Sequence, residues 1–116
     1  ALLKTSPTGT YNANTTNYSD VTDNSDEAEG VGYVAGGNTL ANPSISLSGS
    51  TAIVDYDNTT WSSVTVSADG CLIYNASKSG KAIAVINFGG TKFSVADDFI
   101  ISFPTADASN AIIRIT

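Results

Sequence analysis

The chain has 116 residues, of which 41% are hydrophobic, and its mean hydropathy is +0.04. This length suits one domain, and this composition is that of a folded globular chain rather than a disordered one. Eleven acidic and five basic residues give a net charge of −6. Because the basic residues are few and scattered, we expect no direct binding to nucleic acid and none to an anionic membrane surface.

Histidine is absent, and Cys71 is the single cysteine. A Ser–His–Asp or Cys–His pair, an internal disulfide and a zinc site built from His and Cys are therefore impossible. No apolar run approaches the ~20 residues that cross a bilayer, and no segment has the pattern of a signal peptide. We expect no enzyme, no cofactor, no metal site and no membrane partner.

The N-terminal part is mostly polar. A short strand is predicted at Ala1–Lys4, followed by a loop or arm from Thr5 to Asp20 that is rich in Thr, Asn and Ser. The one helical turn that the sequence indicates is Ser25–Glu29, with Ser25 as its N-cap and Gly30 as its end. We therefore describe residues 1–30 as an N-terminal strand, arm and loop, and residues 31–116 as the strand-rich core of a single domain.

Strand and turn residues alternate along the rest of the chain. Ser44–Ser48 alternates polar and apolar residues as a half-buried strand does, and Gly49-Ser50 joins it to the next strand as a hairpin. Asp69-Gly70 is a hairpin turn by the same criterion, and Gly89-Gly90 also indicates a turn. Strands are predicted at Gly32–Val34, Ser44–Ser48, Thr51–Tyr56, Ser62–Ala68, Cys71–Asn75, Ala82–Phe88, Phe99–Phe103 and Ala111–Ile115.

The spacing of these elements predicts the fold class. About eight short strands with almost no helix are typical of an all-β, single-domain antiparallel β-sandwich or a jelly-roll-like barrel. The nearly continuous apolar run Ala82–Phe88 favours a central strand that is buried on both faces. The sequence shows no internal repeat and no linker, so we draw no domain boundary.

Few side chains suggest chemistry. The acids between residues 20 and 29 could bind Ca²⁺ through oxygen ligands, but their spacing does not match the calcium-binding loop, and a solvated charge run is favoured. Cys71 lies in a predicted strand, where a buried and inert thiol is expected. Trp61 is expected to pack in the core or at its rim, with a carbohydrate platform as the alternative. The acids of this run are Asp20, Asp23, Asp26, Glu27 and Glu29.

Five stretches carry a resemblance to a known family. The stretch from Asp26 to Leu40 is similar to the E-x-x-G-x-G-Y-x-x-G-G-x-x-L signature of small virion structural proteins of tailed bacteriophages. The likeness covers the chain best from Asp26 to Ile115, and the family offers no catalytic residues to carry over. The four later stretches, in order, are Trp61–Thr65, Cys71–Asn75, Ala84–Gly90 and Asp98–Phe103.

The resemblance implies a structural role in the phage particle. The leading interpretation is a capsid decoration or cement protein on the shell exterior, where an acidic surface fits better than beside DNA. Its expected partners are the major capsid protein and other copies of itself, with a trimer favoured. Ordinary core packing is an equal alternative for Leu2, Leu3 and Tyr33. The candidate interface residues, chosen because tyrosines and apolar side chains favour interfaces, are Leu2, Leu3, Tyr11, Tyr18 and Tyr33.

Two other interpretations stay open at the level of the sequence. A tail, fibre or adsorption component would bind a host glycan or protein, and Trp61 and Tyr56 would then be stacking platforms. A glycan hydrolase would need paired carboxylates, and Asp55 and Asp57 are the pair to test. Solvated turn residues are favoured over catalysts, because Asp is common in turns and all the available acids lie at predicted strand ends or turns. These acids are Asp55, Asp57, Asp69, Asp97 and Asp98.

Overall fold

The computed structural model describes residues 1–104, 107, 109 and 113–115. By the clustering of its internal contacts, the chain forms two compact units. Unit 1 comprises Ala1–Gly37 and Trp61–Phe99, and unit 2 comprises Asn38–Thr60 and Ile100–Thr116. About half of the described residues lie in strands, which form two antiparallel sheets, and helix is almost absent. The prediction of an all-β chain is confirmed.

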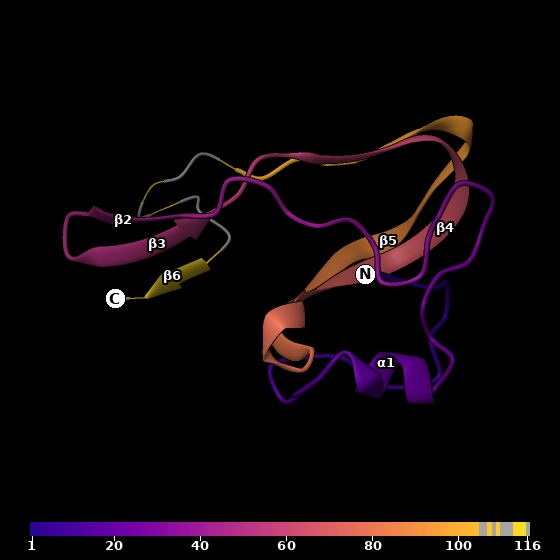
Figure 1. Cartoon of the computed structure of the whole chain (residues 1–116), viewed down its shortest axis with the longest axis horizontal. Coiled ribbons are helices and arrows are strands. Elements are labelled where there is room, and N and C mark those ends of the chain that lie inside the picture. The colour runs from indigo at the N-terminus through magenta and orange to yellow at the C-terminus, as the bar shows by residue number, and fades with distance from the viewer. Residues whose placement is uncertain (105–106, 108, 110–112, 116) are drawn as a thin grey trace. The chain divides into compact units, whose positions relative to one another are not determined.

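Unit 1 is built around two long strands. Strand β4, Thr59–Asn75, lies between the short β1, Leu2–Leu3, and β5, Lys81–Ile101. The 3₁₀ turn η1, Ala76–Lys78, connects β4 to β5, and the two strands run together as a long bent ribbon (Figure 1). Register pairs Leu2 with Cys71 and Leu3 with Gly70.

The core of unit 1 comes from alternate positions of β4. Trp61, Val64, Val66 and Ala68 are all buried. The step from 61 to 64 breaks the two-residue period of a strand, because Ser63 adopts a φ of 50° and adds one residue to the strand as a bulge. The bulge shifts the phase of the alternation, so that Trp61 and Val64 are both buried although they are three positions apart.

The N-cap of helix α1, Ser19–Asp23, is Tyr18, which makes no side-chain capping bond, but the side chain before it satisfies one N–H of the first turn. The Asn17 Oδ1 accepts a hydrogen bond from the Ser19 N–H at 2.9 Å. Val21 faces inward and is fully buried, and it packs with Leu3 and Leu72. The predicted helical turn at Ser25–Glu29 is therefore misplaced, since the helix begins at Ser19, and Ser25 itself has a φ of 55°, which no right-handed helix contains.

Unit 2 holds a smaller sheet in the order β2-β3-β6, with β2 at Ser44–Ser48, β3 at Thr51–Asp55 and β6 at Ile113–Ile115. The predicted hairpin is confirmed, since β2 and β3 pair antiparallel around Gly49-Ser50. Strand β3 ends at Asp55, one residue before the predicted end at Tyr56. Ala111 and residue 112 of the last predicted strand lie outside the described residues, and β6 accounts for the rest.

Several finer predictions are wrong. The described residues contain five strands of three or more residues and the two-residue β1, rather than about eight short strands. Packing as a sandwich or a barrel stays a prediction. The segment Gly32–Val34 is irregular rather than a strand, and the Glu27 carboxylate accepts hydrogen bonds from the Tyr33 hydroxyl within it and from the Gly36 N–H beyond it. Ala82–Phe88 belongs to β5, which borders its sheet, so the segment is only partly buried.

The two predicted turns inside the long strands are also wrong. Strand β4 continues through Asp69-Gly70, and β5 continues through Gly89-Gly90. At Gly70 the reason is a close approach, since a Cβ there would lie 2.5 Å from the carbonyl oxygen of Ile86. Gly89 and Gly90 both have positive φ, and the Asn87 Oδ1 accepts a hydrogen bond from the Gly89 N–H, which lets the strand proceed after a local distortion.

Candidate functional site

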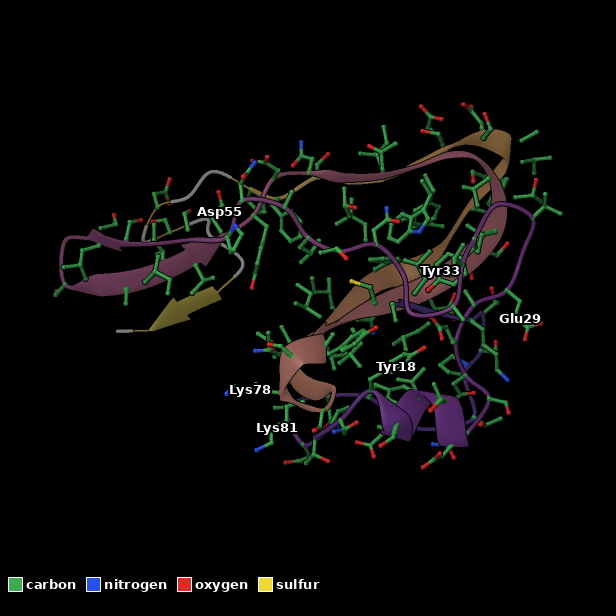
Figure 2. All side chains as sticks on the ribbon, in the orientation of Figure 1. Tyr18, Glu29, Tyr33, Asp55, Lys78 and Lys81 are labelled. Carbon is green, nitrogen blue, oxygen red and sulfur yellow. The ribbon has the colours of Figure 1, made fainter. Side chains whose placement is uncertain are left out.

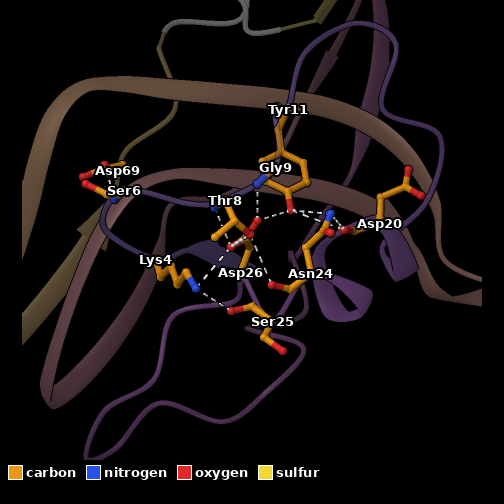
Figure 3. Close-up of polar contacts among 10 residues, drawn as sticks. All are labelled: Lys4, Ser6, Thr8, Gly9, Tyr11, Asp20, Asn24, Ser25, Asp26 and Asp69. Carbon is orange, nitrogen blue, oxygen red and sulfur yellow. Dashed lines mark hydrogen bonds and ion pairs between the residues drawn. The ribbon is translucent and has the colours of Figure 1, made fainter.

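The most developed polar cluster of unit 1 surrounds the carboxylate of Asp26 (Figure 3). This side chain has no exposed surface. Its Oδ1 accepts from the N–H of Thr8 at 2.8 Å and from the Thr8 hydroxyl at 3.0 Å. Its Oδ2 accepts from the N–H of Gly9 at 2.8 Å and from the Tyr11 hydroxyl at 2.5 Å. Lys4 completes the shell with an ion pair of 3.2 Å.

This environment decides the ionisation of Asp26. Burial by itself would raise the pKa of the carboxyl group, but the hydrogen bonds from Tyr11, Thr8 and Gly9 outweigh it and hold the pKa well below its ordinary value. The charged form is thus the one that the fold requires. The sequence-based interpretation of this acid as part of a solvated run is wrong, and Asp26 instead closes the loop of residues 4–11 onto the chain after α1.

A second cluster forms around Glu27, the next residue. Its Oε1 accepts from the Tyr33 hydroxyl at 2.8 Å and from the Gly36 N–H at 2.6 Å, and its Oε2 accepts from the Tyr18 hydroxyl. Tyr18 also stacks on Tyr74 with ring centroids 4.5 Å apart. Figure 2 shows Tyr18 and Tyr33 facing the interior of this region, while Glu29 extends outward. Burial raises the pKa of Tyr18 and of Tyr33, and the bond to Glu27 raises each further.

The predicted interface residues are placed mainly inside unit 1. Leu2 is fully buried and Leu3 is 4% exposed, so both follow the core-packing alternative. Tyr11, Tyr18 and Tyr33 are half-buried and direct their hydroxyl groups at the two carboxylates. These five side chains therefore stabilise the chain itself, and only the exposed parts of the tyrosine rings are available to a partner.

A polar hollow of about 350 Å³ adjoins the Asp26 cluster. The Tyr11 hydroxyl and the Asp20 carboxylate are engaged within the chain. The side chains of Asn14 and Asp23, by contrast, have no hydrogen-bond partner among the described residues. Such a surface can hydrogen-bond a small polar ligand. Its walls are formed by Thr10, Tyr11, Asn12, Asn14, Thr15, Asp20, Asp23 and Asn24.

The two candidate stacking residues lie in different surroundings. Trp61 is 7% exposed and is enclosed by aromatic rings, with Tyr33 at 5.9 Å and Phe99 at 6.0 Å between centroids. It matches the core or rim packing that the sequence favoured. Tyr56 is half-buried, and its ring centroid lies 5.7 Å from that of Phe103. Trp61 is therefore too enclosed to serve as a stacking platform.

The two acids considered for hydrolysis also differ. The Asp57 carboxylate is exposed and accepts a hydrogen bond from the Asn42 amide at 2.5 Å. Asp55 ends β3, and its Oδ1 is buried without a hydrogen-bond partner in the described part of the chain (Figure 2).

Burial lifts the pKa of the Cys71 thiol to about 11, and Cys71 is 4% exposed.

The described residues contain no cluster of three or more His, Cys, Asp or Glu side chains that could hold a metal ion. Among the helices of the described segments, none has the length and apolar character needed to cross a membrane.

The sheet of unit 2 has a feature that the sequence did not indicate. Ile45 and Leu47 of β2 are 80% and 76% exposed, although the alternation predicted that they would be buried. Register places Ile45 beside Val54 and Leu47 beside Ala52, so these four residues share one face. The opposite face carries Ile53, which is 2% exposed. Periodicity identifies the apolar face of a strand, but it does not tell whether the chain itself covers that face.

Comparisons with family models, with curated proteins and with solved structures find no match to this chain. The resemblance to small virion structural proteins of tailed phages accordingly stays a prediction from the sequence.

Proposed function

We propose that this chain is a non-enzymatic structural component of a tailed-phage particle, and specifically a capsid decoration protein that binds the outer shell and stabilises it. The observation that carries the proposal is the open apolar face of β2 and β3, on which Ile45 and Leu47 are almost fully exposed. An exposed apolar patch on a small protein marks a surface that associates with another molecule. A decoration protein works by association alone.

The rest of the surface supports the same role. Large apolar side chains are exposed in unit 1 as well, among them Phe93 and Val95 at 70% and 69%. Each fold unit therefore leaves apolar surface open that assembly would cover. The net charge of −6 makes the remaining surface suited to the outside of a shell rather than to contact with packaged DNA. The proposed partners are the major capsid protein and further copies of this chain.

The test is addition of the purified chain to particles that lack it. The unmodified chain should sediment with the particles and raise the temperature at which they release DNA. The Leu47→Asp variant should lose this binding, because it places a charge on the apolar face. The Val31→Asp variant is the matched control, since it introduces the same charge at an equally exposed apolar position of unit 1. Equal loss with both variants, or no binding by the unmodified chain, would contradict a decoration role through this face.

A second candidate function is a tail, fibre or adsorption component that binds a host glycan. The polar hollow beside Asp26 favours it, because amide, hydroxyl and carboxylate groups line a space of about 350 Å³. A glycan array probed with the unmodified chain and with Asn14→Ala distinguishes the two functions. Binding that depends on Asn14 would favour adsorption, and the absence of any binding would remove this candidate.

A further inference from the structure

Strand β2 is an edge strand whose five residues, which follow directly on Pro43, carry none of the usual protection. It borders its sheet, with β3 as its neighbour (Figure 1). Edge strands of soluble proteins are commonly blunted by charged side chains, by proline or by a bulge, because their free N–H and C=O groups otherwise pair with another strand. Within Ser44–Ser48 the residues are serine, isoleucine and leucine only, and β2 pairs with β3 residue for residue without a bulge.

The sequence of β2 is complementary to itself. Serine stands at positions 44, 46 and 48, with an apolar residue at 45 and at 47. If a second β2 strand pairs antiparallel about Ser46, each Ile45 faces the Leu47 of the other copy, and serine faces serine. The apolar face then continues across the junction without interruption. One row of apolar side chains then runs from Ala52 and Leu47 of the first copy to Ile45 and Val54 of the second copy. The row related to it by the twofold axis is identical.

The charge distribution directs a second copy to this edge rather than to other parts of the surface. Each chain carries a net charge of −6, so two copies repel one another over most of their surfaces. Strand β2 contains no charged residue, and the charged residue nearest to it in register, Asp55, pairs with Ser44 from the far side. The edge of β2 is thus a place where two acidic chains can approach without facing like charges.

We propose that two copies of this chain associate through their β2 edges, with the strands antiparallel about Ser46 and the two sheets of unit 2 joined into one. This inference rests on the associating role proposed above and names one of its contacts. The contact is twofold by geometry. It gives a dimer, and the trimer implied by the resemblance would need another surface. Five-residue edges bury less than the ~1,200 Å² of a standard interface, so the isolated contact is weak.

A weak contact of defined register is best captured by a disulfide. Cα atoms of directly opposed residues lie about 4.5 or 5.5 Å apart in antiparallel pairs, and both distances suit a disulfide. The Ser46→Cys variant should therefore form a covalent dimer under mild oxidation. The Ser44→Cys variant should not, because two copies of residue 44 are four residues, about 13 Å, apart along the paired strands. The buried Cys71 serves as an internal control in the unmodified chain.

The register has a second test. An equimolar mixture of Ser44→Cys and Ser48→Cys should give heterodimers, since these positions oppose one another in the proposed pairing. We expect Ser46→Cys to cross-link on the order of tenfold or more faster than Ser44→Cys alone, because pairing raises the effective concentration of opposed thiols. Introducing the Leu47→Asp substitution into both cysteine variants should abolish this difference in cross-linking rate. Introducing Val31→Asp into both should leave the difference unchanged.

Equal rates for all single cysteine variants would overturn the inference, since they would show random collision. Efficient cross-linking of Ser44→Cys with itself would overturn it too, because that result requires either parallel strands or an antiparallel register centred on Ser44 rather than on Ser46. Either result could be obtained while the chain still binds particles, so failure of this contact and failure of the proposed function are separate outcomes.

Discussion

At the scale of single residues, Asp26 holds the N-terminal loop in place. Four hydrogen bonds and one ion pair converge on a carboxylate with no exposed surface. Their donors come from residues 4–11, which form almost no regular secondary structure. A buried charge is tolerated only when it is fully paired, so each donor is needed and each is fixed by the same group.

Replacement of Asp26 by Asn should destabilise the chain. The amide keeps one acceptor oxygen but turns the other into a donor that faces the N–H of Gly9 or Thr8. We expect a loss of about 2 to 4 kcal/mol in the free energy of unfolding, measured with denaturant. Asp23→Asn is the control, because Asp23 is exposed and lacks a partner among the described residues, and it should change stability by about 0.5 kcal/mol or less. Equal effects would contradict the role given to Asp26.

The same pair of variants predicts a dependence on pH. The pKa of Asp26 is lowered in the folded chain, so its contribution to stability is complete above the ordinary carboxyl pKa of ~3.9 and is lost as pH falls toward the folded value. The unmodified chain should thus lose stability on acidification below about pH 4 more steeply than Asp26→Asn. Thermal melting of both proteins across the acid range measures this difference, and parallel curves would refute it.

Cys71 should be inert in the folded chain. The thiolate is the reactive species, and a pKa of about 11 leaves only about one thiol in a thousand ionised at pH 8. A thiol reagent should therefore label Cys71 only after denaturant is added. Labelling of the native chain at the rate of an exposed thiol would show that the β1–β4 region opens.

At the scale of elements, the long ribbon of β4 and β5 depends on local departures from regular strand geometry. Both Ser63 in β4 and Ala96 in β5 have positive φ, and a side chain of the neighbouring strand accepts a hydrogen bond from the N–H of each. Asp98 accepts from the Ser63 N–H at 3.1 Å, and the Thr65 hydroxyl accepts from the Ala96 N–H at 2.9 Å. Each strand therefore supplies the side chain that stabilises the local distortion in the other strand.

Gly70 is expected to be required for close approach of the backbones rather than for a turn. A Cβ at Gly70 would lie 2.5 Å from the Ile86 carbonyl oxygen, whereas a Cβ at Gly89 would meet nothing within 4 Å. Gly89 has a φ of 75°, so alanine there costs backbone strain alone, about 1 kcal/mol. We predict that Gly70→Ala lowers the free energy of unfolding by more than Gly89→Ala does, by about 1 to 3 kcal/mol. An equal loss of stability for both variants would mean that β4 and β5 can move apart at Gly70 at no cost in free energy, and it would contradict the role given to Gly70.

The sequence predicts elements where local pattern and tertiary role agree. The hairpin of β2 and β3 is predicted correctly because its alternation and its Gly49-Ser50 turn are both local features. Asp69-Gly70 has the same local appearance but serves a contact with Ile86 from the neighbouring strand, which no local pattern reveals. The tyrosines of the candidate site can be identified in the sequence. Their carboxylate partners, Asp26 and Glu27, are predicted to be solvated, because residue spacing does not reveal which distant side chains meet in the fold.

At the scale of the whole molecule, apolar surface and negative charge act against each other in association. Salt screens repulsion between exposed charges and does not weaken the burial of apolar area. We therefore predict that the cross-linking rate of Ser46→Cys rises with ionic strength, while that of Ser44→Cys rises less. A decrease with salt would indicate that attraction between opposite charges, rather than the neutral β2 edge, brings the copies together.

The most direct test of a structural role in the particle is the number of copies of this chain in purified phage, measured by gel densitometry against the major capsid protein. A decoration protein should be present at one copy per shell subunit, or at a simple fraction of that number. A handful of copies per particle would place the chain in the tail or fibre instead, and its absence from the particle would contradict the structural role altogether.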